Sequence, residues 1–234
     1  MNNILKSAIT VSMAAALLVL PSVSAQAATY SESKDLVVMG PRDLPEAAQV
    51  HGNAFLLHAN GGGSTYLYIE QQQGARLAVF DVTDPSRIKL AVSEQIPNQG
   101  PFDFVRPLGD NEELIYFRDA QKAGVLDLSK AKKPVVRTAG AAAELMTAEP
   151  LGETGYLATH VAYQYEPAVA RDFQVIDAST ASPTLLATVQ GVKHRVTNDE
   201  TGTTFLLGSE GLTVVRRISV ENEHQVEELQ MRGN

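Results

Sequence analysis

The sequence contains no cysteine and no tryptophan, and only fourteen of its 234 residues are phenylalanine or tyrosine. Without cysteine the chain forms no disulfide and offers no thiolate to a metal ion. An exported domain without disulfides depends on its hydrophobic core alone. The absence of cysteine is more typical of a protein of the bacterial periplasm than of a disulfide-rich extracellular module. The 44% of hydrophobic residues is ordinary for a globular domain.

Positive charge is also scarce, with 19 Lys and Arg residues against 27 Asp and Glu residues and a formal net charge of −8. Residues 1–27 contain Lys6 and no acidic residue, so without them the net charge is −9. An acidic chain without a stripe of basic residues repels phosphate backbones. Nucleic acid is therefore not an expected partner.

Residues 1–27 have the pattern of a signal peptide. Lys6 supplies the positive n-region, residues 8–20 are mostly apolar, and Ala25-Gln26-Ala27 fits the small-x-small cleavage rule. The alternative is an uncleaved amphipathic helix. The apolar stretch is shorter than the about 20 residues that span a bilayer, and no later segment approaches that length. We expect an exported protein, periplasmic or secreted, that begins near Ala28 and has no transmembrane segment.

One short pattern recurs along the rest of the chain. An apolar run leads to an aspartate that is followed two residues later by Ser or Thr, and a proline stands further on. The aspartates are Asp81, Asp127 and Asp177, and a degraded fourth copy has Arg216 in their place, so the spacings are 46, 50 and 39 residues. Such spacing indicates an array of similar supersecondary units.

Each unit is expected to contain four short strands, here called a, b, c and d, because runs rich in Val, Leu, Ile, Tyr and Phe alternate with Gly, Pro, Asp and Asn. The strands are expected at residues 55–58, 66–70, 76–81 and 88–94, then 102–107, 114–117, 123–128 and 135–139, then 144–148, 155–159, 172–178 and 184–189, and finally 194–198, 203–207, 211–218 and 225–230.

Four-stranded units of 40 to 50 residues are typical of a β-propeller. The predicted fold class is therefore all-β, a small β-propeller of about four four-stranded antiparallel blades. The expected division is a signal peptide at 1–27, an N-terminal segment at 28–54 and propeller repeats at 55–234. An ordinary β-sandwich is the alternative, although a sandwich has no reason to repeat its turn chemistry.

The units resemble the LVIVD repeat, a propeller repeat of exported bacterial and archaeal proteins. The residues that carry the resemblance are 77–85, 124–129 and 173–179, and the resemblance covers roughly residues 55–230. It implies a propeller fold and no particular activity. Arg216 departs from the pattern, and four units are the low end of the propeller range.

Two ways of completing the fold follow from the low number of units. Either four blades close into a ring, or an open half pairs with a second copy as a homodimer. Strand 36–39 is a candidate for addition to the last blade, which would join the two ends of the chain.

The three repeated aspartates have two interpretations. They either accept backbone N–H bonds two residues on and stabilise the c–d turn, or form a ring of carboxylates for metal or acid–base chemistry. The loss of the aspartate at Arg216 favours the turn.

Known catalytic and ligand-binding motifs are not evident. The five histidines show no metal-binding spacing and no G-x-S-x-G elbow is present, so no metal, cofactor or catalytic residue is assigned. Residues 60–64 contain three glycines and are read as a turn. A phosphate-binding loop is the alternative, but a β-like run follows where such a loop needs a helix.

Blade topology places the candidate binding residues. The d–a and b–c connections of such blades emerge on one face, and binding residues gather on loops held by a rigid scaffold. The b–c connection of the third unit, residues 160–171, is the longest and carries two tyrosines, which either contact a ligand or cover a core edge. The candidate ligand-binding residues on this face are His51, Asp119, His160, Tyr163, Tyr165, Lys193 and His194.

Polar residues on the a strands are expected to line a central channel, and they are His58, Arg106, Thr147 and Asn198. Contact with water in such a channel explains these polar residues as well as a binding site there would. The preferred function is a non-enzymatic binding module that takes an unknown protein or a small polar ligand on the loop face. The alternatives are a metal-dependent hydrolase or lactonase-like enzyme with its site in the channel, and a structural envelope scaffold.

Overall fold

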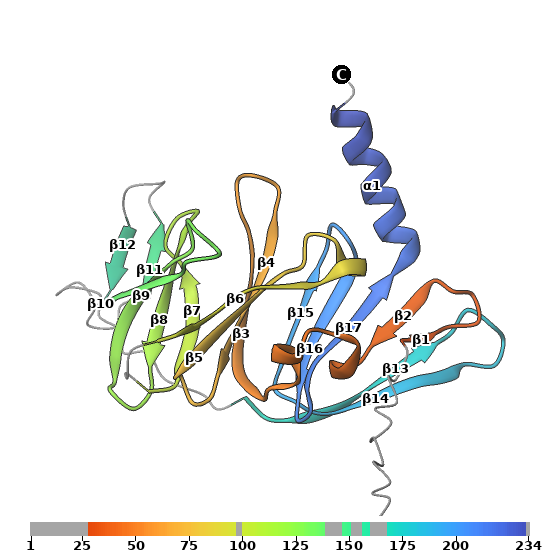
Figure 1. The fold of residues 1–234 in the computed structure, drawn as a ribbon, viewed down its shortest axis with the longest axis horizontal. Coiled ribbons are helices and arrows are strands. Elements are labelled where there is room, and N and C mark those ends of the chain that lie inside the picture. Colours follow the sequence, from red (N-terminus) through yellow and green to blue (C-terminus); the bar gives the residue numbers. More distant parts are fainter. Residues whose placement is uncertain (1–27, 97–99, 139–146, 151–155, 160–167, 233–234) are drawn as a thin grey trace, which may run out of the picture.

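The computed structural model describes residues 28–96, 100–138, 147–150, 156–159 and 168–232. Within these residues the chain is mostly β, every strand pair is antiparallel, and one α-helix is present. Figure 1 shows the sheets arranged side by side along the long axis of the molecule. Three short 3-10 turns, at Pro41–Asp43, Glu46–Gln49 and Pro85–Arg87, lie in the connections.

Two sheets each contain four consecutive strands. The first sheet has the order β3 (Gly52–Ala59), β4 (Thr65–Gln71), β5 (Arg76–Asp81) and β6 (Lys89–Gln95). The second sheet has the order β7 (Phe102–Pro107), β8 (Glu112–Phe117), β9 (Lys122–Asp127) and β10 (Val135–Thr138). The central strands carry apolar residues on both faces, which is expected of strands that are covered on both sides.

A third sheet, here called the terminal sheet, joins the two ends of the chain. It contains β15 (His194–Asn198), β16 (Thr203–Gly208) and β17 (Gly211–Arg217), followed by β2 (Leu36–Met39) and β1 (Thr29–Tyr30). β2 pairs with β17 in the register Met39 with Val214 through Leu36 with Arg217. The N-terminal strand therefore occupies the place of a fourth strand.

The prediction of a strand at residues 225–230 is wrong, because these residues belong to the helix α1 (Ile218–Arg232). The edge of β17 on which such a strand would pair is already occupied by β2. The first turn of α1 is held by Asp35, whose carboxylate accepts the Ser219 N–H at 2.8 Å. Arg216 forms an ion pair with Glu221 of the helix, with 2.6 Å between Nη2 and Oε2.

The third unit does not form one four-stranded sheet among the described residues, which corrects the expectation of four equal units. Its first half is the hairpin of β11 (Thr147–Pro150) and β12 (Tyr156–Thr159), and its second half is the hairpin of β13 (Arg171–Asp177) and β14 (Thr184–Val192). The two hairpins lie at opposite ends of the molecule (Figure 1). Each is thus half of a unit.

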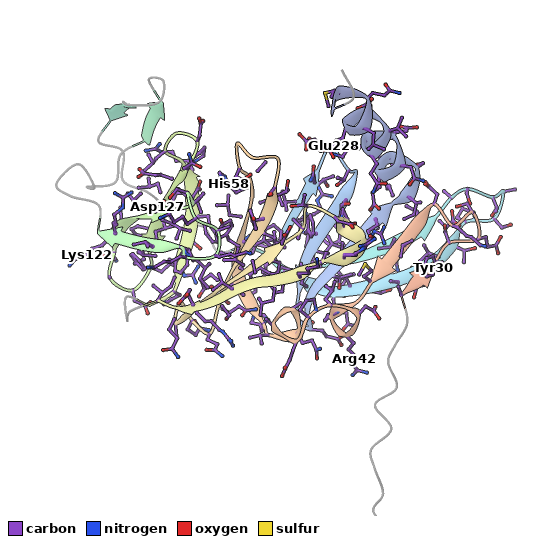
Figure 2. The ribbon with its side chains drawn as sticks, turned by 45° about the horizontal axis from the view of Figure 1, so that its top comes forward. Tyr30, Arg42, His58, Lys122, Asp127 and Glu228 are labelled. Atoms are coloured by element: carbon purple, nitrogen blue, oxygen red, sulfur yellow. The ribbon has the colours of Figure 1, made fainter. Side chains whose placement is uncertain are left out.

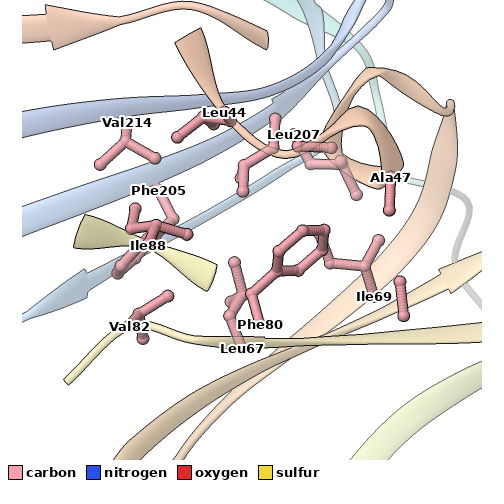
Figure 3. Close-up of a cluster of buried hydrophobic side chains, with 13 residues drawn as sticks. Leu44, Ala47, Leu67, Ile69, Phe80, Val82, Ile88, Phe205, Leu207 and Val214 are labelled. Carbon is pink, nitrogen blue, oxygen red and sulfur yellow. The ribbon is translucent and has the colours of Figure 1, made fainter. Parts of the chain in front are cut away.

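The core lies between neighbouring sheets. Leu67, Ile69 and Phe80 of the first sheet pack against Phe205 and Val214 of the terminal sheet, as Figure 3 shows. On its other face, the first sheet packs against the second. The residues of this cluster include Tyr68, Leu77 and Val79 of the first sheet and Phe102, Ile115, Phe117 and Leu126 of the second. A smaller cluster joins Val189 and Val192 of β14 to Leu206 of the terminal sheet. Each sheet therefore buries its faces only with the help of its neighbours.

The turn interpretation of the repeated aspartates is confirmed. Asp81 accepts the Thr83 N–H at 3.1 Å, Asp127 the Ser129 N–H at 2.9 Å, and Asp177 the Ser179 N–H at 2.9 Å. These bonds lower the pKa of the Asp127 and Asp177 carboxyls, because they stabilise the ionised form. The repeated aspartate therefore stabilises the turn that connects strand c to strand d, and its role is local.

The pairing of β2 makes a testable difference to stability. Val37 is only 1% exposed, so Val37→Ala should lower the free energy of unfolding by about 1.5–2 kcal/mol through lost apolar burial. Tyr30→Ala, at an exposed position of β1, should cost less than about 0.5 kcal/mol. Urea unfolding followed by circular dichroism measures both values. Equal stabilities for the two variants would contradict a supporting role of β2.

Candidate functional site

The connections of the sheets gather at two opposite rims. At one rim, here called the loop rim and made of residues 71–75, 100–101, 118–121, 190–193 and 208–210, the b–c turns contact the d–a connections. The Arg118 N–H donates to the Pro101 carbonyl at 2.8 Å, and the Ser209 N–H donates to the Gln190 carbonyl at 2.9 Å. A Cβ on Gly74 would lie 1.9 Å from the carbonyl oxygen of Gly100, so only glycine fits there.

The strand registers identify equivalent positions at the loop rim. Ala54 lies opposite Glu70, Asp103 opposite Tyr116, and His194 opposite Leu207. These pairs occupy the same place in the first, second and terminal sheets. Asp103 and His194 are therefore two copies of one repeat position, and Glu70 stands where the other two sheets have Tyr116 and Leu207.

Three charged residues, Glu70, Asp103 and Arg118, link the first and second sheets near the loop rim and are here called the ionic cluster. The guanidinium of Arg118, just after β8, forms an ion pair with Asp103 and lies 4.0 Å from Oε2 of Glu70. The side chain of Glu70 is fully buried, whereas those of Asp103 and Arg118 are 12% and 15% exposed. The cluster therefore reaches the surface through Asp103 and Arg118.

The carboxylates of the cluster offer more acceptors than the protein satisfies. Within the described residues both oxygens of Glu70 and Oδ2 of Asp103 are buried and have no hydrogen bond of ordinary geometry. The Asn53 side chain and the Gly74 N–H nevertheless act as hydrogen-bond donors toward Glu70 and lower the pKa of its carboxyl. Buried polar atoms usually have well-formed hydrogen bonds, so three buried carboxylate oxygens that lack one in a single place need an explanation.

Burial determines the charge state of this cluster. It raises the pKa of the Glu70 carboxyl, an effect that Asn53 and Arg118 oppose, and it raises the pKa of the Asp103 carboxyl against the opposing influence of Arg118. Burial also lowers the pKa of His194, against a hydrogen bond to the Asn53 backbone and the charge of Asp103. The cluster thus holds one permanent cation and two carboxyl groups that ionise reluctantly. An added positive charge would favour their ionised forms.

The structure places the residues predicted on the loop face as follows. His194 begins β15, is partly buried, and its ring centroid lies 5.9 Å from that of Phe55. Asp119 lies beside Gly100, and the exposed Lys193 and His51 immediately precede β15 and β3. Of this set, His194 is near enough to the ionic cluster for the charge of Asp103 to raise its pKa, against the larger effect of burial. The predictions for His160, Tyr163 and Tyr165 lie outside the described residues.

The four residues predicted to line a channel lie on four different strands. His58 near the end of β3 has a buried Nε2, without a hydrogen bond among the described residues, and its ring lies 6.4 Å from that of Tyr68. Figure 2 shows His58 in the middle part of the molecule. Arg106 lies on β7, and Asn198 ends β15 and accepts the Glu200 N–H at 3.0 Å, which is a turn contact. Thr147 lies on β11, and its side chain is outside the described part of the structure.

Sequence reasoning missed Glu70, Asp103 and Arg118. The available signal was the alignment of the repeats, which places a glutamate where the equivalent strands have Tyr116 and Leu207. A charged residue in a row of core positions is unusual.

Among the residues that the structure describes, no group of three or more His, Cys, Asp or Glu side chains is placed to hold a metal ion. In the same residues no helix combines the length and the apolar character needed to cross a membrane. Comparison with models of known protein families and with curated proteins found no match.

A buried carboxyl group outside the ionic cluster makes stability depend on pH. Glu113 of β8 is 3% exposed, and burial raises its pKa to about 8, against the opposing charge of Arg106. The folded state therefore binds more protons than the unfolded state between about pH 4.5 and pH 8, so stability falls as pH rises through this range.

Glu113→Gln should remove this part of the pH dependence and raise the free energy of unfolding at pH 8 by on the order of 2 kcal/mol. The measurement is urea unfolding of both proteins at pH 5 and pH 8. Glu94→Gln, at an exposed position of β6, is the control and should change little at either pH. A stability difference between Glu113→Gln and the parent chain that is the same at both pH values would contradict the assignment.

Proposed function

We propose that this protein is an exported β-propeller that acts as a binding module, and that its loop rim takes a small ligand bearing an amine or another donor-rich cationic group. The observation that carries the proposal is the cluster of Glu70, Asp103 and Arg118, with its buried acceptor oxygens. The proposal has three parts, which concern the architecture, the destination and the ligand.

The propeller architecture is supported by the way in which the units repeat. The inner strands β3, β7 and β15 are neighbours, since β3 contacts both of the others. The b–c turns and the a–b turns lie on opposite rims, and the same aspartate turn recurs in three units. The resemblance of residues 77–85, 124–129 and 173–179 to LVIVD repeats agrees with this arrangement. A radial array of sheets accounts for all of these features together.

Export is supported by the pattern of residues 1–27. If the protein is exported, the mature chain should begin near Ala28. Expression of the complete coding sequence in a Gram-negative host, followed by cell fractionation and N-terminal sequencing, measures this directly. Recovery of the chain in the cytoplasm with Met1 intact would contradict export to the periplasm or the medium.

The charge of the cluster indicates what it would bind. Two carboxyl groups share a single guanidinium, so the ionised cluster carries one net negative charge in a place with little water. An ammonium group donates several hydrogen bonds and brings the missing positive charge, which compensates for the burial of both carboxylates. Internal water would satisfy the acceptors without supplying that charge. A neutral or anionic ligand would leave the charge uncompensated as well.

The exposure of Asp103 and Arg118 supports entry from the loop rim. His51, Asp119, Lys193 and His194 lie on or next to this rim, so they remain candidates for contacts with the outer part of the ligand. Such a site is a binding site rather than a catalytic one, because no nucleophile is assigned to it.

Binding of a cation should depend on Glu70. Putrescine and arginine are suitable probes, each tested at millimolar concentration by isothermal titration calorimetry at pH 7.5. We expect saturable binding of at least one probe, and at least about tenfold weaker binding by Glu70→Gln, because loss of one charge-assisted contact costs about 1.4 kcal/mol or more. Affinity for the parent chain should rise from pH 5 to pH 7.5 as the carboxyls ionise.

Glu113→Gln is the matched control, since Glu113 is also a buried carboxyl group but lies outside the cluster. It should bind the probe as the parent chain does. No binding of any probe, or equal binding by Glu70→Gln, would contradict the proposed ligand. Saturable binding of a divalent metal that is lost in His58→Ala would favour the metal-dependent alternative instead.

A further inference from the structure

The third unit leaves two strands without the partner that their counterparts have. Strands b and c pair in the other three units, as β4 with β5, β8 with β9 and β16 with β17. In the third unit, b is β12 and c is β13, and among the described residues β12 pairs only with β11 and β13 only with β14. Each hairpin therefore presents one strand edge of unpaired N–H and C=O groups, which is a template for another strand.

The β13–β14 hairpin also exposes side chains that are buried in the equivalent units. The residue before the turn aspartate is Phe80 in the first unit, Leu126 in the second and Ile176 in the third. Phe80 packs against the terminal sheet and Leu126 against the first sheet, and both are fully buried. Ile176 is 47% exposed, and Leu185, directly opposite it on β14, is 53% exposed.

The repeat shows what should cover this face. Phe80 and Leu126 each contact the preceding sheet in the array, so Ile176 should contact the second sheet. A bulge stands at the same place in β5, between Val79 and Phe80, and in β13, between Val175 and Ile176, which supports the equivalence. Within one copy, however, the β13–β14 hairpin lies at the end of the molecule remote from the second sheet (Figure 1).

We propose that a second copy of this chain completes the third unit. Strand β12 of one copy pairs antiparallel with β13 of the other, and Ile176 and Leu185 pack against the second sheet of the partner. Because each copy contributes one β12 and one β13, a two-fold axis generates two identical junctions and leaves neither edge open. The resulting ring has eight units, which lies within the range of known propellers. The inference rests on the repeat architecture proposed above and not on the ligand.

The mass of the protein in solution tests this proposal whether or not an amine binds. Light scattering on the mature chain at about 100 μM should give twice the monomer mass, and dilution should give the monomer. Ile176→Asp should weaken self-association at least about tenfold, since it places a charge in the apolar contact. The residue is half-exposed in one copy, so the monomer should remain folded by circular dichroism.

Leu229→Asp is the matched control, because Leu229 is 71% exposed but belongs to α1 and not to the β13–β14 hairpin. It should leave the dimer intact. The proposal is overturned by a parent mass at about 100 μM other than twice the monomer, by a dimer that persists at that concentration in Ile176→Asp, or by dissociation of Leu229→Asp there.

Engineered disulfides test the strand pairing itself, and the absence of native cysteine makes the result unambiguous. One sample carries Gln174→Cys on β13, and the other carries Leu157→Cys, Ala158→Cys or Thr159→Cys on β12, to cover adjacent registers. Oxidation of the mixture should give a cross-linked heterodimer with at least one of the three. Failure of all three overturns the proposal, as does a cross-link within a single chain when both cysteines are placed together.

Discussion

The structure depends on the packing of neighbouring sheets face to face, and the first sheet has both of its faces covered in this way. In β4 the alternating side chains are divided between two cores, with Leu67 and Ile69 packed toward the terminal sheet and Tyr68 toward the second sheet. A strand with two covered faces must be apolar at nearly every position. No sheet is then stable on its own, and the positions left for polar chemistry are the strand ends at the two rims.

The ionic cluster interrupts this rule at one rim. Glu70 continues the row of Tyr68 and stands at a position where the terminal sheet has Leu207. A buried carboxylate near a guanidinium adds little net stability, because desolvation offsets the attraction. An apolar residue would serve the core better, so a role in binding accounts for Glu70 more fully than packing does.

How far the sequence predicts this molecule depends on whether the determining contacts are local. The aspartate turns are local, so Asp81, Asp127 and Asp177 could be assigned from the sequence, and the strand-rich composition indicated the antiparallel sheets. The helix α1 was missed because its alternative, a strand on β17, is excluded by the pairing of residues far away in β2. The ionic cluster was missed for the same reason, since Glu70, Asp103 and Arg118 meet only across two sheets.

At the β13–β14 end of the array, an exposed apolar face and a strand edge without a partner among the described residues occur together. Many different partners could cover an exposed apolar face, whereas an open strand edge pairs only with another strand in the correct register. The open strand edge of the hairpin therefore restricts the choice of partner much more than its exposed hydrophobic side chains do. The cluster of Glu70, Asp103 and Arg118 lies between the first and second sheets, away from both ends, so it is complete within one copy. The proposed ligand binding and the proposed self-association thus use separate parts of the molecule.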